Sequence, residues 1–210
     1  MFDDTNLQPA LPKGGGRAYL AAMRASDLDI LIIPGLGGSG PDHWQSRWAQ
    51  KLSTARVVEQ QDWLNPSRDA WVDAIRREID ASARPVALVG HSLGCIAAAS
   101  AIAETPARDK IAMAFLVAPP DPDAPALPEG SIDPGFKEKA PQAALGVPGV
   151  IIASRNDAFA DYSFAERLAL LWGLDLADAG DAGHINAESG HGPWPEGLMR
   201  LAGLFSRLSR

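Results

Sequence analysis

The residue best placed for chemistry in this 210-residue sequence is Ser92, within the segment Val89-Gly-His-Ser-Leu-Gly-Cys95. Gly90 and Gly94 flank it at the spacing Gly-x-Ser-x-Gly, which is typical of a nucleophilic serine on a sharp turn between a strand and a helix. That turn strains the backbone, so the residues two before and two after the serine must be small. An apolar run precedes the motif and an alanine-rich stretch follows it. We therefore predict that Ser92 is an activated nucleophile.

A serine nucleophile needs a histidine to take its proton, and the chain has 4 histidines. His91 is the neighbour of Ser92, so its side chain is expected to point away from the serine side chain. His184 follows the last candidate strand, in the late loop where hydrolases of the order Ser, Asp, His have their base. We predict His184 as the base, with His191 as the alternative.

A carboxylate must hold the imidazole in the productive tautomer. Asp157 comes directly after a candidate strand at 149–153, at the edge of the sheet where open α/β folds assemble their sites. Asp121 and Asp123 also follow a strand and are alternatives. The order 92, 157, 184 agrees with the hydrolase arrangement and differs from the chymotrypsin and subtilisin orders.

The oxyanion of such a reaction needs two backbone donors. The Leu93 N–H lies at the start of the helix that follows Ser92, where the helix dipole favours negative charge. The loop Pro34-Gly-Leu-Gly-Gly-Ser-Gly-Pro41 follows the first candidate strand, where the second donor is expected, and we choose Leu36, then Gly37. The loop lacks the Lys-Ser/Thr ending of a phosphate-binding loop, so nucleotide binding is not predicted.

Aromatic residues near these loops are candidates for substrate contact. Trp44 is close in sequence to the oxyanion loop, and Trp194 is close to His184. We predict that these two indoles, together with His43, contact substrate at the mouth of the site. Cys95 lies three residues after Ser92 and is interpreted as a small buried side chain rather than a thiol nucleophile.

The elements that position these residues alternate along the chain. Short apolar runs, typical of parallel strands, are separated by stretches of helical period, which indicates an α/β fold with helices on both faces. We predict about six mostly parallel strands, helices at 67–81, 96–103 and 196–208, and no room for a large cap domain. The predicted strands lie at 28–33, 55–59, 85–89, 112–117, 149–153 and 174–178.

The composition of the sequence disfavours several classes of function. Residues 1–27 are predicted to be a flexible leader with a short helix at 17–24, and 28–210 a single domain. The net charge of -7 disfavours binding to nucleic acid and to anionic membranes. A single cysteine and the lack of a secretory signal at the start predict a cytoplasmic protein. No paired cluster of His, Asp or Glu has the spacing of metal ligands, so no metal or other cofactor is predicted.

Several segments together resemble a known family. They are Gln61-Asp-Trp63, Val117-Ala-Pro-Pro-Asp121, Ser154-Arg-Asn-Asp157, Ala182-Gly-His-Ile-Asn186 and Gly190-His-Gly-Pro-Trp194, with the oxyanion loop and the Ser92 motif. From about residue 29 onward the chain resembles the small serine hydrolases typified by the retinoblastoma-binding protein 9 and YdeN group, in the α/β-hydrolase superfamily. This resemblance implies a compact α/β-hydrolase with little or no lid and a triad at Ser92, Asp157 and His184.

The residues and the resemblance lead to one functional prediction. We expect a serine hydrolase that cleaves small carboxylic esters, or related acyl bonds such as thioesters and amides, through an acyl-enzyme. Its partner would be a small-molecule acyl substrate, with specificity set by the proline-rich stretch 119–148. The alternative is an idle or slow hydrolase-fold protein that acts as a binding module.

Overall fold

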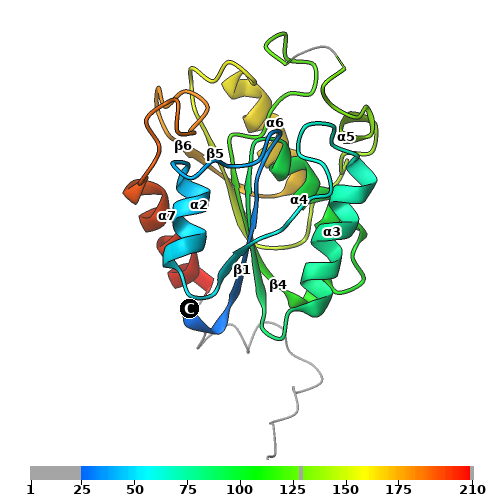
Figure 1. Cartoon of the computed structure of the whole chain (residues 1–210), viewed down its shortest axis with the longest axis vertical. Coiled ribbons are helices and arrows are strands. Elements are labelled where there is room, and N and C mark those ends of the chain that lie inside the picture. Colours follow the sequence, from blue (N-terminus) through cyan, green and yellow to red (C-terminus); the bar gives the residue numbers. More distant parts are fainter. Residues whose placement is uncertain (1–24, 128–129, 209–210) are drawn as a thin grey trace, which may run out of the picture.

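A six-stranded sheet forms the centre of the molecule in the computed structural model, which describes residues 25–127 and 130–208 (Figure 1). The strand order is β2-β1-β3-β4-β5-β6, and every neighbouring pair is parallel. This confirms the predicted parallel α/β sheet. The strands are β1 (Asp29–Ile33), β2 (Ala55–Val57), β3 (Val86–His91), β4 (Ile111–Val117), β5 (Gly149–Ala153) and β6 (Asp175–Asp178).

Helices cover both faces of the sheet. One face, here the α2 face, carries α2 (Trp44–Lys51) and α7 (Pro195–Leu208). The other, the α4 face, carries α3 (Arg68–Ala81), α4 (Leu93–Glu104) and α6 (Tyr162–Trp172). Figure 1 shows α2 and α7 together at one side, away from α3. Within the residues described, no helix is both long and apolar enough to cross a membrane.

The boundaries of several elements differ from the prediction. β2 is shorter than 55–59, whereas β3 runs on to His91 because Gly90 and His91 pair with Leu116 and Val117 of β4. α4 begins at Leu93 rather than at 96. Of the predicted leader, 1–24 with its short helix lies outside the described residues, and Ala25–Asp27 forms a 3-10 turn. A second such turn spans Arg108–Lys110.

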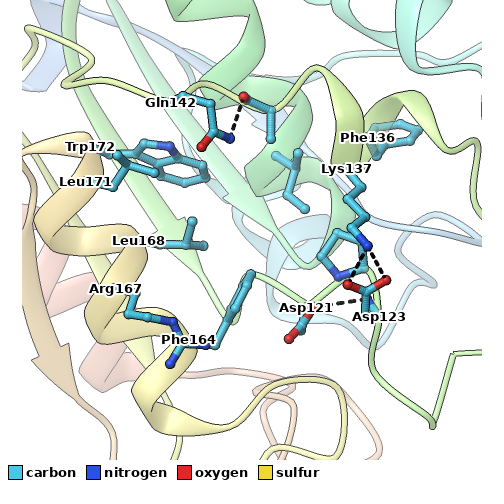
Figure 2. A pocket seen from close by; sticks show the side chains of 13 residues that line it. Asp121, Asp123, Phe136, Lys137, Gln142, Phe164, Arg167, Leu168, Leu171 and Trp172 are labelled. Carbon is cyan, nitrogen blue, oxygen red and sulfur yellow. Dashed lines mark hydrogen bonds and ion pairs between the residues drawn. The ribbon is translucent and has the colours of Figure 1, made fainter.

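The stretch between β4 and β5 folds over the α4 face. It contains the short helix α5 (Gly135–Glu138) and is fixed to α3, where the Arg68 N–H donates to Asp133 Oδ2 over 2.8 Å. The ring of Phe136 packs edge-on against Trp71 of α3. Figure 2 shows the hollow that this stretch encloses with α6. Within 25–127 and 130–208 the chain forms no large cap domain.

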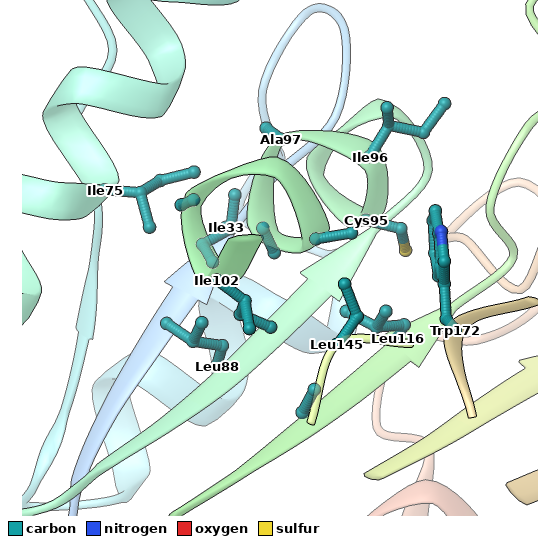
Figure 3. Close-up of a cluster of buried hydrophobic side chains, with 14 of the residues drawn as sticks. Ile33, Ile75, Leu88, Cys95, Ile96, Ala97, Ile102, Leu116, Leu145 and Trp172 are labelled. Atoms are coloured by element: carbon teal, nitrogen blue, oxygen red, sulfur yellow. The ribbon is translucent and has the colours of Figure 1, made fainter. Parts of the chain in front are cut away.

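Two hydrophobic clusters fill the space between the sheet and its helices. Alternate side chains of each strand point to opposite faces, so Leu31 and Ile33 join the α4 face while Ile30 and Ile32 join the α2 face. The α4-face cluster is mainly aliphatic and alanine-rich (Figure 3). The α2-face cluster is built around Trp44, Trp48, Trp194 and Phe115.

Candidate active site

Ser92 lies on a strained turn between β3 and α4, with φ 54° and ψ −131°. The two flanking glycines make this turn sterically possible. A Cβ atom on Gly94 would lie 2.2 Å from the Ile33 carbonyl oxygen, and one on Gly90 would lie 3.0 Å from the Cys95 Cα. A side chain at Gly94 would collide with the backbone, and one at Gly90 would be tightly crowded. The turn therefore holds Ser92 above the end of the sheet through backbone sterics.

Ser92, His184 and Asp157 form a continuous hydrogen-bonded chain. The His184 Nε2 lies 2.9 Å from the Ser92 Oγ, and the His184 Nδ1 lies 2.8 Å from the Asp157 Oδ2. A carboxylate accepts hydrogen bonds, so Nδ1 carries the proton and Nε2 is free to accept from the serine hydroxyl. The side chains of His184 and Asp157 are 11% and 3% exposed, respectively. This arrangement can remove the proton of Ser92 as it attacks a carbonyl carbon.

Asp157 is fixed by its own loop, which follows β5. Its Oδ1 accepts a hydrogen bond from the Phe159 N–H over 2.9 Å. The ring of Phe159 packs against the imidazole of His184, with 4.5 Å between the ring centroids. One short turn thus supports both the carboxylate and the imidazole.

The backbone around His184 is held by side chains that the sequence did not single out as functional. Ser154 Oγ accepts from the Ala182 N–H over 2.9 Å, and Asn156 Oδ1 accepts from the Gly183 N–H over 2.7 Å. Both residues belong to the segment Ser154-Arg-Asn-Asp157, one of those on which the resemblance noted in the sequence rests. That segment was the signal that could have identified them.

His91 also supports the base, although we predicted only that its side chain points away from Ser92. Its Nε2 lies 2.9 Å from the carbonyl oxygen of His184. A carbonyl only accepts, so His91 carries its proton on Nε2 and donates it. Burial lowers the pKa of His91 well below its ordinary value, so this imidazole is neutral. The donor is therefore a neutral N–H that adds no positive charge beside His184.

Two backbone amides are candidates to donate hydrogen bonds to an oxyanion. The Leu93 N–H is in the first turn of α4, where amides have no partner within the helix. The loop after β1 passes directly against the nucleophile, because a Cβ on Gly35 would lie 2.7 Å from the Ser92 Cβ. The amide of Gly37 already donates to the Trp63 carbonyl over 2.8 Å. Leu36 is therefore the better candidate for the second donor.

The structure does not favour the predicted substrate contacts at the mouth of the site. Trp44 is fully buried and Trp194 is 5% exposed, because both pack into the α2-face cluster. The Trp44 Nε1–H donates to the Ile185 carbonyl over 2.9 Å. His43 is buried too, and its Nδ1 accepts from the Gln45 N–H at the start of α2. We therefore assign these residues to support of the site rather than to contact with substrate.

The alternative residues have other partners and are not part of the hydrogen-bonded chain. His191 Nδ1 contacts Ser189 Oγ, 3.1 Å away. Asp123 pairs with Lys137, and Asp121 accepts from the Asp123 N–H. Cys95 is buried with its Sγ on the Val117 carbonyl, and burial raises the pKa of its thiol well above the ordinary value. Within 25–127 and 130–208, no group of three or more His, Cys, Asp or Glu could hold a metal ion.

Known proteins share this sequence pattern and fold. The family model described as serine hydrolase matches residues 30–203. A protein of Pectobacterium atrosepticum described as a YdeN-like hydrolase is 36% identical with a TM-score of 0.75, over 88% of this chain and 94% of that one. The ydeN gene product of B. subtilis is 22% identical with a TM-score of 0.66, over 84% and 98%. No curated protein matches the chain significantly.

More distant structures share the fold alone. The esterase domain of a Rhodothermus marinus protein is 15% identical with a TM-score of 0.62, over 85% of this chain and 87% of that domain. The α/β-hydrolase fold predicted from the sequence is thus confirmed. The family model covers most of the chain, and Ser92 lies on the turn between β3 and α4. The protein therefore belongs to the serine hydrolase family.

Proposed function

We propose that this protein hydrolyses carboxylic esters through a covalent acyl-enzyme, with Ser92 as the nucleophile, His184 as the base and Asp157 as the residue that orients the base. The observation that carries the proposal is the chain of hydrogen bonds from Ser92 Oγ through the His184 ring to Asp157 Oδ2, with distances of 2.9 and 2.8 Å. A hydroxyl in this setting is a far stronger nucleophile than an isolated serine.

In the first half of the reaction, Ser92 Oγ bonds to the ester carbonyl carbon while its proton moves to His184 Nε2. Negative charge develops on the carbonyl oxygen, and the amides of Leu93 and Leu36 donate hydrogen bonds to it. Asp157 stabilises the imidazolium. The carbon–oxygen bond to the alcohol then breaks, and the alcohol leaves with the proton from Nε2.

In the second half, a water molecule attacks the acyl carbon and gives its proton to His184 Nε2. The bond between the acyl carbon and Ser92 Oγ breaks, Oγ takes the proton back from Nε2, and the carboxylic acid leaves. Every proton moves between the substrate, water, Ser92 and His184, so the chain's own side chains and amides account for each step.

The proposal is tested by steady-state hydrolysis of 4-nitrophenyl acetate. Ser92→Ala and His184→Ala are each expected to lower kcat/KM by several orders of magnitude, as loss of a triad member does. His191→Ala is the matched control and should retain most of the activity. A His184→Ala variant that keeps its activity while His191→Ala loses it would reassign the base. An unaffected Ser92→Ala variant would overturn the proposal.

A further inference from the structure

A cavity of about 330 Å³ lies on the α4 face, between the stretch after β4 and helix α6 (Figure 2). This volume is within the range of small-molecule sites. Its lining is mostly apolar side chains: Ile96, Phe136, Phe164, Leu168, Leu171 and Trp172. Such a lining favours an apolar ligand.

Two connections link the cavity to the candidate active site. Ile96 lies four residues after Ser92, one turn along α4, and helical side chains lean back toward the N-terminal end of their helix. Figure 3 shows Ile96 and Trp172 on the same side of α4. At the rim, the Asp121 N–H donates to the Phe159 carbonyl over 2.9 Å, and Phe159 packs against His184. The cavity wall therefore includes Ile96, one helical turn from the nucleophile, and Asp121, which is joined to the base through Phe159.

The polar groups around the cavity already have partners within the protein. Lys137 pairs with Asp123 over 2.7 Å, and Trp172 Nε1–H donates to the Pro141 carbonyl over 3.0 Å. The guanidinium of Arg167 lies 5.8 Å from the Phe164 ring centroid and donates to Ser163. A ligand with its own charge or hydrogen-bonding groups would compete with these pairs. An apolar chain would leave these pairs intact.

We propose that this cavity binds the acyl group of the substrate, and that this group is an apolar chain of medium length, from hexanoyl to decanoyl, rather than acetyl. The inference rests on the proposed function, since it places the acyl chain of the Ser92 reaction. It also revises the expectation of a small acyl group from the sequence. Each methylene buried in an apolar cavity improves binding about fourfold.

The test compares kcat/KM for 4-nitrophenyl acetate and octanoate on the full chain. The wild type should prefer octanoate by about tenfold or more. Leu168→Trp, which fills the cavity, should reduce this preference by about tenfold or more, because the chain loses its buried surface. Leu171→Trp, at the more exposed side of the cavity, is a second filling variant should Leu168→Trp fold poorly.

Leu170→Trp is the matched control, because Leu170 lies on the same helix and is 86% exposed outside the cavity. It should keep the wild-type preference within about twofold. Labelling of Ser92 by a fluorophosphonate separates the two proposals. If Ser92 labels but the wild type shows no preference, or the filling variants leave the preference unchanged, the cavity proposal is overturned and the proposed function stands. If Ser92 in the folded protein does not label, the proposed function itself fails.

Discussion

The two faces of the sheet support the candidate site by different physical means. On the α4 face, the nucleophile is placed by small residues in close contact, with Gly94 of α4 against the Ile33 carbonyl. On the α2 face, hydrogen bonds from buried rings help to hold the loop that carries the base. His91 donates to the His184 carbonyl, and Trp44 donates to the Ile185 carbonyl.

Because of this difference, we expect substitutions on the two faces to impair the site in different ways. At the turn that carries Ser92, the α4 face is sensitive to added volume, because the backbone contacts of Gly94 leave no space for a Cβ atom. The α2 face is sensitive to the loss of a donor or to a change in protonation, because its rings act through N–H groups. Substitutions that add volume on the α4 face can be compared with substitutions that remove a donor or a titrating group on the α2 face.

The largest effect is expected from Gly94→Ala. The added methyl would overlap the Ile33 and Pro34 carbonyl oxygens, at 2.2 and 2.5 Å, so the turn that carries Ser92 must move. A displacement near 1 Å at a reacting group lowers activity on the order of a hundredfold. We expect kcat/KM for 4-nitrophenyl acetate to fall by at least that order, and thermal unfolding to shift to a lower temperature.

Gly203→Ala provides the matched control for this substitution. Gly203 lies within α7 on the other face, and a Cβ there meets nothing within 4 Å. The variant should keep full activity and gain up to about 1 kcal/mol of stability, as alanine replaces glycine in a helix. Equal activity of the two variants would refute the idea that volume limits the α4 face.

An intermediate effect is expected from His91→Phe. Phenylalanine keeps a buried ring but removes the N–H that holds the His184 carbonyl. The loss should lower kcat by about tenfold through misplacement of the base, while KM changes little. Steady-state kinetics separate the two constants. A kcat within error of the wild type would show that this hydrogen bond does not position His184.

The smallest effect on activity is expected at His43, whose protonation instead changes the stability of the fold against acid. Burial, with a smaller contribution from His184, lowers the pKa of His43 from 6.5 to about 4. As the pH falls from 6.5 toward 4, the unfolded chain binds a proton here and the folded protein does not, so the fold loses stability. This loss is about 2 kcal/mol at pH 5.

His43→Asn tests this effect, because asparagine retains a side-chain acceptor for the start of α2 but does not titrate. Urea unfolding at pH 8 and pH 5 should show a smaller loss of stability in the variant than in the wild type, with His91 accounting for part of what remains. The same loss in both proteins would contradict the assignment to His43.

Local pattern was enough to predict much of the fold and the candidate residues. The alternation of strands and helices, the turn at Ser92 and the loop position of His184 are short-range features, and the structure brings Ser92, His184 and Asp157 together. The role of His91 was missed because its partner carbonyl is 93 residues away.

The burial of Trp44 was missed for a related reason. Proximity in sequence to a loop does not show which way a helix turns its first residue, and α2 turns Trp44 into the α2-face cluster. The cavity on the α4 face arises where the stretch after β4 packs against α6. Neither segment, taken alone, has a sequence pattern that predicts this cavity.

Covalent labelling of the purified full chain with a fluorophosphonate, with the modified peptide mapped by mass spectrometry, tests directly whether Ser92 is activated. We expect a single modification at Ser92, and its loss in both Ser92→Ala and His184→Ala. Labelling elsewhere, or none in a folded wild-type protein, would contradict the claim that Ser92 is activated. That result would favour a hydrolase-fold protein that binds ligands without turning them over.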